Sequence, residues 1–577
     1  MVLDRVRTVA SLGARATRAV RDVGVLHPVR PDRAVRLVFA GARFGPTPAT
    51  LGAMAALRFP TRTALHDERG ALTYAELEQQ AAAVATALHQ RLTNATPSRN
   101  KKSAATPTTT EEPTATTRTP TRPGEATPNQ QDAGKPEARI GVLCRNHRGF
   151  VISLLAASRL GNDVVLLNTD FSATQLGDVT EREGVRLLLH DQEFDEVVEQ
   201  SSFDGQRVHA WTDHPSDSRL PTIEELADTE PVAYKPPRPS RVVILTSGTT
   251  GTPKGARHDV SLAAVVPAAL SHLMRVPVRS GTPILVAPPL FHVLGMAYML
   301  VALGMGMPLV LLRRFDPGKV LDAVDAYRVE ALVAVPVMLQ RILDASRGRP
   351  LPDSLRVVVS GGSALHPHLS EAFMDVFGDV LHNVYGATET GWATIATPRD
   401  LREAPGTVGR PTFRLTIKIL DEDGRELPSG EIGEIYTGGG LRFAGYTGGG
   451  GKRVHEGLAS SGDLGHFDSA GRLFVDGRAD DMIVSGGENV FPGEVEDLLG
   501  RHPDVAEVAV VGVEDADFGQ RLAAYVVRER GASIDEEDVK RYVKENLARY
   551  KVPRDVYFVD ELPRTSSGKV RPHALPN

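Results

Sequence analysis

From residue 139 onward, short apolar runs alternate with stretches in which apolar residues recur at helical spacing. The runs are rich in valine, leucine and isoleucine, as expected for strands buried on both faces. They occupy residues 140–144, 163–167, 186–189, 242–246, 284–287, 309–312, 332–335 and 356–359. Because parallel neighbouring strands need a crossover, usually a helix, this alternation predicts an α/β fold with layered, largely buried sheets.

The pattern changes twice toward the C-terminus. After about residue 410, short strands punctuated by glycine, such as Leu415–Leu420 and Gly433–Tyr436, predict a small β-barrel-like subdomain. After about residue 480, helical and strand patterns predict a compact α+β unit. A chain of 577 residues is too long for one core. We therefore expect a basic extension at 1–45, a large domain at 46–479 and a small mobile C-terminal domain at 480–577.

The composition argues against several classes of protein. A formal net charge of −6, with no basic helix carrying interleaved aromatic residues, argues against a nucleic-acid-binding protein. The single cysteine, Cys144, excludes an internal disulfide and a cysteine-based zinc site. It is typical of a buried core position in a reducing cytosol, so we expect a cytoplasmic protein. The oligomeric state, monomer or homodimer, stays open.

Two segments raise the question of membrane contact. Residues 291–312 carry no formal charge and are long enough to span a bilayer, but Gly304, Gly306 and Pro308 interrupt them. We therefore expect a buried helix followed by a buried strand. Residues 1–44 contain nine arginines and three aspartates among aliphatic residues. They fit either a basic segment lying on an anionic membrane surface or an ordinary solvated extension.

A polar insertion is expected after the first long helix. Thr73 and Glu76 form a capping-box pattern before apolar residues at helical spacing. Residues 94–137 then contain no Val, Ile, Leu, Met, Cys or aromatic residue. Such a segment buries too little surface to offset its ordering entropy, so we expect disorder there and assign it no chemistry.

Residues 246–256 read TSGTTGTPKGA and directly follow the apolar run at 242–245. Glycines let backbone N–H groups turn toward an anion, hydroxyls add donors, and Lys254 adds a positive charge. The loop differs from a Walker A motif, because no Ser or Thr follows the lysine and the glycine spacing is different. A phosphate-binding loop is a better interpretation than a plain surface turn.

The loop also resembles the phosphate loop of the adenylate-forming superfamily, which includes acyl-CoA synthetases, adenylation domains and luciferases. Further matches follow in the family's order: PLFHVLG at 289–295, GGSAL at 361–365, NVYGATET at 383–390, SSGDLG at 460–465, GRADDMIVSGGENVFPGEVE at 477–496 and PRTSSGKVR at 563–571. The resemblance covers roughly residues 50–577 apart from the insertion. A lone histidine, an isolated loop acid or a terminal lysine would ordinarily be structural or solvated, but the ordered series favours functional roles.

The resemblance implies a set of site residues. ATP would be bound by Thr246, Ser247, Gly248, Thr249, Thr250, Gly251, Lys254, Gly361, Gly362, Ser363, Tyr385, Gly386, Thr388, Asp463, Arg478, Gly486 and Gly487. Among these, Tyr385 would stack on adenine, Asp463 would hold the ribose, and Gly486 and Gly487 would face the site during the second step. Thr246 and Glu389 would hold Mg²⁺. His292 would line the channel where thiol meets acyl group, Lys569 would be the catalytic lysine, and Asp480 the hinge.

The implied reaction has two steps. A carboxylate attacks the α-phosphate of Mg·ATP, giving acyl-adenylate and pyrophosphate. The small domain then rotates about Asp480, and CoA attacks the adenylate and releases AMP. Lys569 would act in the first step only, by neutralising charge that develops at phosphorus.

A fatty acid is the expected acid substrate, of unknown chain length. The candidate pocket residues are apolar: Gly295, Met296, Met299, Val335, Val337, Gly391 and Trp392. Residues 37–51 also resemble actinobacterial-type fatty-acyl-CoA synthetases. Three alternatives stay open: a fatty-acyl-AMP ligase that loads a carrier protein, an aryl-acid ligase of the coumarate type, and a non-catalytic sensor. The last is disfavoured, because Glu389 and Lys569 are both present.

Overall fold

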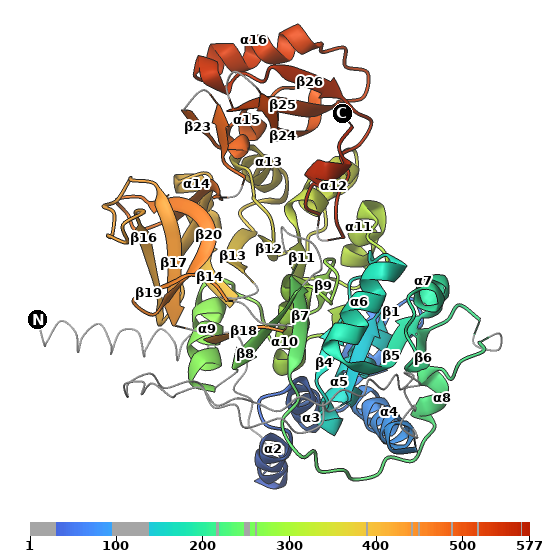
Figure 1. Ribbon diagram of the computed structural model, residues 1–577. Helices are drawn as coiled ribbons and strands as arrows, with labels where there is room; N and C mark the ends of the chain where they lie inside the picture. Colours follow the sequence, from blue (N-terminus) through green and yellow to red (C-terminus); the bar gives the residue numbers. More distant parts are fainter. Residues whose placement is uncertain are drawn as a thin grey trace, which may run out of the picture.

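A computed structural model describes residues 31–94, 138–214, 218–246, 254–259, 262–387, 391–439, 442–447, 451–479, 481–485, 488–515, 519–566 and 568–576. Figure 1 shows a large body of layered sheets and helices with a small unit above it, formed by the C-terminal residues. The predicted α/β fold class, with a large N-terminal and a small C-terminal domain, is confirmed. Residues 1–30 of the predicted extension, and 95–137 of the predicted insertion, lie outside the described residues.

The largest sheet has fourteen strands in the order β16-β17-β20-β21-β15-β14-β13-β12-β11-β9-β10-β1-β2, with β19 paired to β20. Its middle, from β13 to β1, is parallel, which explains the continuous apolar runs there. From β14 to β16 the pairing is antiparallel. The strands are β1 Thr63–Asp67, β2 Gly70–Thr73, β9 Ile284–Val286, β10 Leu309–Val310, β11 Ala331–Ala334, β12 Val357–Gly361, β13 Leu381–Ala387, β14 Gly391–Ala396, β15 Thr407–Pro411, β16 Leu415–Leu420, β17 Gly433–Gly439, β19 Val454–His455, β20 Leu458–Phe467 and β21 Leu473–Arg478.

A second sheet of seven strands has the order β18-β8-β7-β4-β3-β5-β6. Strands β7 to β6 are parallel, and β8 and β18 extend one edge with antiparallel pairing. The strands are β3 Arg139–Leu143, β4 Val164–Leu166, β5 Val185–Asp191, β6 Gln206–Trp211, β7 Val242–Thr246, β8 Lys254–Asp259 and β18 Arg442–Tyr446. The edge strands β8 and β18 were not predicted, because they pair segments almost 200 residues apart in sequence.

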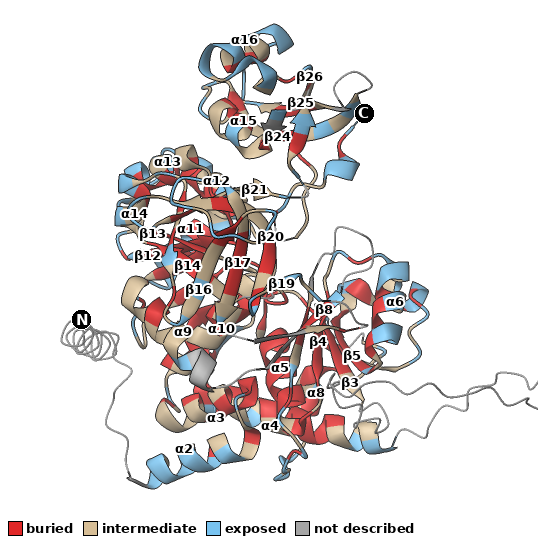
Figure 2. Ribbon diagram, turned by 60° about the vertical axis from the view of Figure 1, so that its left-hand side comes forward, coloured by how far each residue is buried: buried red, intermediate tan, exposed pale blue. Residues whose placement is uncertain are grey.

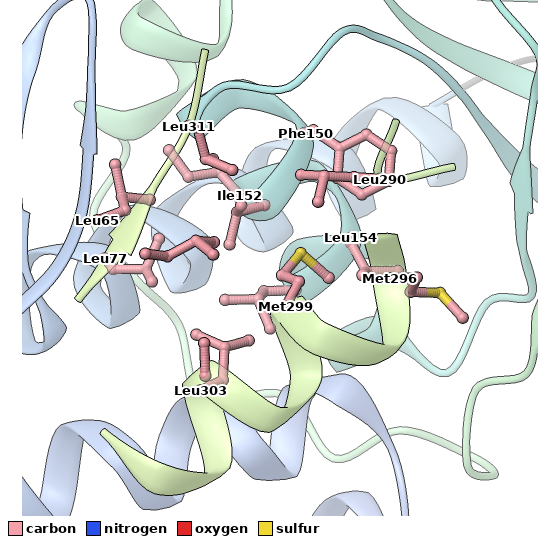
Figure 3. Close-up of a cluster of buried hydrophobic side chains, with 14 of the residues drawn as sticks. Leu65, Leu77, Phe150, Ile152, Leu154, Leu290, Met296, Met299, Leu303 and Leu311 are labelled. Carbon is pink, nitrogen blue, oxygen red and sulfur yellow. The ribbon is translucent and has the colours of Figure 1, made fainter. Parts of the chain in front are cut away.

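Helices between the two sheets build the main core. Figure 3 shows Leu65 from β1, Leu77 from α4, Ile152 from α5 and Met299 from α10 packed into one cluster. These side chains are fully buried, and Figure 2 shows the same concentration of buried residues at the centre of the large body. The helices of the large body are α2 Pro31–Phe44, α3 Pro48–Arg58, α4 Tyr74–Asn94, α5 Arg148–Leu160, α6 Ala173–Glu183, α7 Asp195–Gln200, α8 Ile223–Ala227, α9 Leu262–Arg275, α10 Val293–Met305, α11 Pro317–Ala326, α12 Pro336–Ser346, α13 Pro367–Phe377 and α14 Pro398–Glu403.

Two predictions about individual helices are confirmed. The Thr73 amide donates to Glu76 Oε2 (2.7 Å) and the Glu76 amide donates to Thr73 Oγ1 (3.2 Å), which is the predicted capping box of α4. The uncharged segment 291–312 divides into helix α10 and strand β10, with Gly306 in the left-handed conformation at the helix end. In the described part of the chain, every helix is too short or too polar to cross a membrane.

The small unit packs two helices on a five-stranded sheet. Its core contains Val495 and Leu499 from α15 and Val539 and Val543 from α16, all buried. The parallel partner β26 was not predicted from the sequence. The elements are β22 Ile483–Ser485, β23 Glu488–Val490, α15 Pro492–Leu499, β24 Val505–Asp515, β25 Gly519–Arg528, α16 Glu536–Asn546 and β26 Asp555–Phe558.

Candidate active site

The predicted phosphate loop is closed at its base by a β-hairpin. Thr246 at the end of β7 pairs with Lys254 at the start of β8, and the Lys254 side chain is exposed. The Gly255 amide donates to Thr447 Oγ1 (3.0 Å), and that hydroxyl donates to the buried carboxylate of Glu183 (2.5 Å). A side chain at Gly255 would come within 2.6 Å of Thr447 Oγ1. The hairpin therefore fixes where the loop leaves and re-enters the sheet.

Part of the predicted site lies outside the described residues: Ser247, Gly248, Thr249, Thr250, Gly251, Thr388, Glu389, Asp480, Gly486 and Gly487, together with the Thr246 side chain. The functions assigned to these residues remain predictions from the sequence.

The Asp463 carboxylate of β20 has two side-chain partners, one from β13 and one from β21. The Tyr385 hydroxyl donates to Asp463 Oδ2 (2.6 Å), and Arg478 Nη1 donates to Asp463 Oδ1 (3.4 Å). Burial raises the pKa of Asp463, while Tyr385 and Arg478 oppose that shift. Burial also raises the pKa of Tyr385 well above its usual range, so this hydroxyl stays a neutral donor. The lone pairs that remain on Asp463 can accept hydrogen bonds from a pair of hydroxyls.

Two predicted glycines are required by close backbone packing beside this carboxylate. A side chain at Gly361, at the end of β12, would come within 2.6 Å of the Val384 carbonyl oxygen. A side chain at Gly386 would collide with the Gly391 carbonyl across the β13–β14 pair. Gly362 is exposed with φ +88°, and Ser363 is partly buried. The turn after β12 therefore presents backbone rather than side chains next to Tyr385.

Lys569 sits on a tight turn near the C-terminus. The Thr565 amide donates to the Lys569 carbonyl (2.8 Å), and the Gly568 amide donates to the Thr565 carbonyl (2.8 Å). Gly568 has φ +85°, a conformation that favours glycine. Arg564 braces the turn by donating to the Gly568 carbonyl (2.9 Å) and to Glu507 (2.7 Å). The lysine is thus presented on an ordered turn with an exposed side chain.

This turn inserts into the large body through Ser566. Its amide donates to Asp170 Oδ2 (2.7 Å) and its hydroxyl to Asn168 Oδ1 (3.2 Å), while His292 Nε2 lies 3.3 Å from the same hydroxyl. Arg571 adds an ion pair with Asp170 at 3.4 Å. Asn168 and Asp170 were missed in the sequence, although they directly follow strand β4, where parallel sheets place ligand-binding loops.

The charge of Lys569 influences the pKa values of two predicted site residues, His292 and Asp463. This charge adds to the effect of burial that lowers the pKa of His292, and it opposes the rise that burial causes in the pKa of Asp463. The pKa of His292 falls to about 4, mainly through burial and then through Lys569. His292 is therefore neutral at physiological pH. The structure brings together four predicted residues from distant parts of the chain: His292, Tyr385, Asp463 and Lys569.

The predicted acid-pocket residues divide into two groups. Val335 and Val337 lie against the lysine turn, since a side chain at Gly568 would come within 2.7 Å of Val337 Cγ1. Met296 and Met299 lie in the core between the two sheets (Figure 3). Gly295 packs on the Pro289 carbonyl.

Trp392, which follows Gly391, packs against two other aromatic rings. It stacks on the buried ring of His272 at 4.4 Å between centroids and 19° between planes. The buried ring of Tyr298 lies 5.9 Å from Trp392. These three packed rings, of Trp392, His272 and Tyr298, are called the far wall below.

Comparison with known proteins places this arrangement in a family. A model of the AMP-binding enzyme family matches residues 131–447, and a model of the AMP-binding enzyme C-terminal domain matches residues 494–569. The chain belongs to the AMP-binding enzyme family. The 2-succinylbenzoate–CoA ligase of Bacillus licheniformis is 34% identical over 448 residues, which cover 75% of this chain and 88% of that protein. The feruloyl-CoA synthase of Amycolatopsis sp is 34% identical over 446 residues, with coverage of 76% and 88%.

Solved structures of AMP-binding enzymes agree with this assignment. The o-succinylbenzoate CoA synthetase of Bacillus subtilis, in complex with its acyl-adenylate intermediate, superposes with a TM-score of 0.73 at 27% identity. The match covers 91% of this chain and 98% of that protein. The same synthetase has also been solved with ATP and a magnesium ion.

Asp170 is a positioning residue of this AMP-binding enzyme, since it holds the turn that carries Lys569. We expect Asp170→Ala to lower the rate of acyl-adenylate formation about tenfold, through loss of a charge-assisted hydrogen bond and an ion pair. Transfer from supplied acyl-adenylate to CoA should stay unchanged, because the sequence predicts that the small domain, which carries this turn, rotates away for that step. Pyrophosphate release and transfer are measured separately. Asp178→Ala, an exposed residue of α6, is the control. Equal loss in both steps would contradict a positioning role.

His272 makes stability depend on pH. Neither ring nitrogen has a hydrogen-bond partner among the residues that the structure describes, and burial lowers the pKa to about 3 from 6.5. Between these values the unfolded chain binds a proton that the folded protein excludes, so stability falls as pH drops below 6.5. We expect His272→Phe to reduce that loss by up to about 1.4 kcal/mol per pH unit. The free energy of unfolding is measured by urea titration at pH values from about 7 to 4.5. His573→Phe, which changes an exposed residue, is the control. Parallel curves for H272F and the unmodified protein would contradict this assignment.

Proposed function

We propose that this AMP-binding enzyme is an AMP-forming acid–CoA ligase that joins a carboxylic acid to CoA through an acyl-adenylate. The observation that carries the proposal is the docking of the turn that carries Lys569, since Ser566 of this turn contacts His292, Asn168 and Asp170 of the large body. A lysine there can neutralise charge on the carboxylate and the α-phosphate as they react. Because His292 is neutral, it does not compete with Lys569 for these anions.

The residues around Lys569 suit ATP as substrate. Asp463 would accept the ribose hydroxyls, with Tyr385 and Arg478 fixing its orientation, and the backbone turn at Gly361–Ser363 would lie against adenine. Lys254 and the loop it closes would hold the phosphates, and Thr388 would approach the α-phosphate. The exposed position of Lys254 at the base of that loop supports this role.

A magnesium ion would accompany the nucleotide. Glu389 and Thr246 would hold it; a carboxylate, a hydroxyl and phosphate oxygens are the donors that Mg²⁺ prefers. When bound, the ion would neutralise part of the negative charge on the phosphates of ATP.

The second step would use the same site after rotation of the small domain about Asp480, with Gly486 and Gly487 facing the acyl-adenylate and CoA as acceptor. The contacts that must separate are polar and partly exposed, which supports such a movement. They include His368 with Asp497 (3.1 Å) and Arg571 with Asp170 (3.4 Å).

For the acid, we propose an aromatic carboxylic acid as the first candidate. The relatives named above act on 2-succinylbenzoate and ferulate, both aromatic. The stacked wall of Trp392 and His272 also suits a short planar acid better than a long chain. An aliphatic fatty acid, the expectation from the sequence, is the second candidate, supported by the apolar Val335 and Val337 beside the lysine turn. The named relatives use CoA, which favours CoA over a carrier protein as acceptor.

Trp392 offers a direct test of the acid class. We expect Trp392→Ala to raise kcat/KM for long aliphatic acids by about tenfold relative to aromatic acids, because it removes a large, partly buried ring from the far wall. The ratio is measured for decanoate and 4-hydroxycinnamate. Trp211→Ala, which removes a ring elsewhere in the large body, is the control for general destabilisation. An unchanged ratio in W392A would show that this wall does not bound the acid.

The proposed function itself is tested by supplying ATP, Mg²⁺ and a panel of aromatic and aliphatic acids, with and without CoA. Mass spectrometry then follows AMP, acyl-adenylate and acyl-CoA. Acyl-CoA with an aromatic acid supports the first candidate, and acyl-CoA with fatty acids alone transfers the proposal to the second. Acyl-adenylate that CoA does not discharge would indicate carrier-protein loading. Absence of any adenylate with every acid would refute a ligase.

A further inference from the structure

Helix α2 is apolar on two opposite faces. One face packs on the large body, where Ala40 and Phe44 join Ala49 and Ala53 of α3 in a buried cluster. The opposite face carries Val35, Val38 and Phe39, which are 55%, 72% and 69% exposed. Packing against α3 therefore explains only half of the helix's apolar residues.

This second face is unusual among the described residues. Other exposed large apolar side chains, such as Val232 (66%) and Val454 (67%), are scattered along the chain, whereas α2 gathers three within five positions. Scattered exposed apolar residues are ordinary, but a contiguous set indicates a surface that is covered in use.

The charge around α2 indicates what covers it. Arg33 and Arg36 lie on the same helix. Residues 1–44 contain nine arginines, three aspartates and no lysine or glutamate, which gives +6; the whole chain carries −6, so the rest carries −12. A basic segment at one end of an acidic protein is complementary to an anionic surface.

We propose that α2 docks this protein on an anionic phospholipid membrane, with Val35, Val38 and Phe39 in the lipid interface and the exposed Arg36 at the headgroups. An amphipathic helix with arginines beside an apolar face binds membranes in this way, by burial of apolar area together with attraction to anionic lipid. The proposal does not depend on the proposed enzymatic function.

The position of α2 is compatible with catalysis on the membrane. Figures 1 and 2 both place α2 at the end of the large body opposite the small C-terminal unit. Docking through α2 would therefore leave the small unit facing water. The guanidinium of Arg43 is tied to the body through the Tyr234 carbonyl, so the helix is fixed at its C-terminal end and its apolar face keeps one orientation.

The test is co-sedimentation of the full chain with vesicles of phosphatidylglycerol or of phosphatidylcholine. We expect binding to the anionic vesicles only, weakened by salt. Val38→Ser with Phe39→Ser should lower affinity at least about tenfold, through lost apolar burial. Arg36→Gln should lower it about fivefold. The matched controls are Val232→Ser with Val454→Ser, which are 66% and 67% exposed, and Arg399→Gln, whose side chain is 85% exposed.

Four results would overturn the proposal. One is no binding to either vesicle. Another is equal loss of binding in the control variants. The third is a change of oligomeric state in V38S/F39S without a change in vesicle affinity, measured by analytical ultracentrifugation, which would assign the face to a second copy of the chain. A chain lacking residues 1–30 should still bind anionic vesicles through α2, and loss of all binding there would assign the contact to those residues instead. Circular dichroism of each variant confirms that it folds.

Discussion

Lys569→Ala is expected to lower the rate of acyl-adenylate formation by roughly 10²–10³-fold while leaving transfer from supplied acyl-adenylate to CoA within about twofold of normal. The first effect follows because the lysine charge lies beside His292 and Asp463, where the carboxylate and α-phosphate would meet. The second follows because the turn that carries the lysine belongs to the small domain, which is proposed to rotate away before the thiol attacks. Pyrophosphate release measures the first step, and mass spectrometry of acyl-CoA formed from synthetic acyl-adenylate measures the second.

The controls separate chemistry from folding. Lys540→Ala removes a lysine that pairs with Glu536 on the surface of the same domain, and it should change neither step. Lys569→Arg keeps the charge with a different shape and should recover part of the first step. If K569A slowed both steps equally, the lysine would have to act outside adenylation, and the proposed use of one site for two reactions would fail.

The core of the large domain was predictable because its signal is local. Most of the parallel strands appear in the sequence as continuous apolar runs, since both of their faces are covered. Strands β1, β6 and β13 contain polar residues and were not predicted. The division of 291–312 into α10 and β10 was predictable for a similar reason, because Gly306 ends the helix in a conformation that glycine adopts readily.

The partners of the lysine turn were not predictable from local pattern. Ser566 contacts Asn168 and Asp170 across almost 400 positions in sequence, and these residues meet only because one domain docks on the other. A single sequence contains no periodicity that reports such docking. The matching motif identified Lys569 by resemblance, whereas the docking of its turn beside His292 and Asp170 required the structure.

The acid class was also hard to predict, for a physical reason. Apolar residues near a site can either line a pocket or fill the core, and sequence alone does not distinguish these positions. Met299 proved to be core, and Trp392 proved to stack on a histidine 120 positions away. The expectation of a fatty acid came from apolar character and from the resemblance at residues 37–51, whereas stacking of Trp392 on His272 gives the far wall a definite aromatic shape.

Asp463→Asn should impair both steps, in contrast to K569A. Asp463 would hold the ribose of ATP and of the acyl-adenylate alike, so we expect KM for ATP and KM for supplied acyl-adenylate each to rise roughly 10–100-fold. The cause is loss of a charged acceptor that Tyr385 and Arg478 hold in place. Asp468→Asn changes a carboxylate that pairs with Arg472 at the turn between β20 and β21, and it should leave both KM values unchanged. A D463N variant with raised KM for ATP alone would place Asp463 at the phosphates or metal rather than at the ribose, because pyrophosphate and its ion have left before CoA reacts.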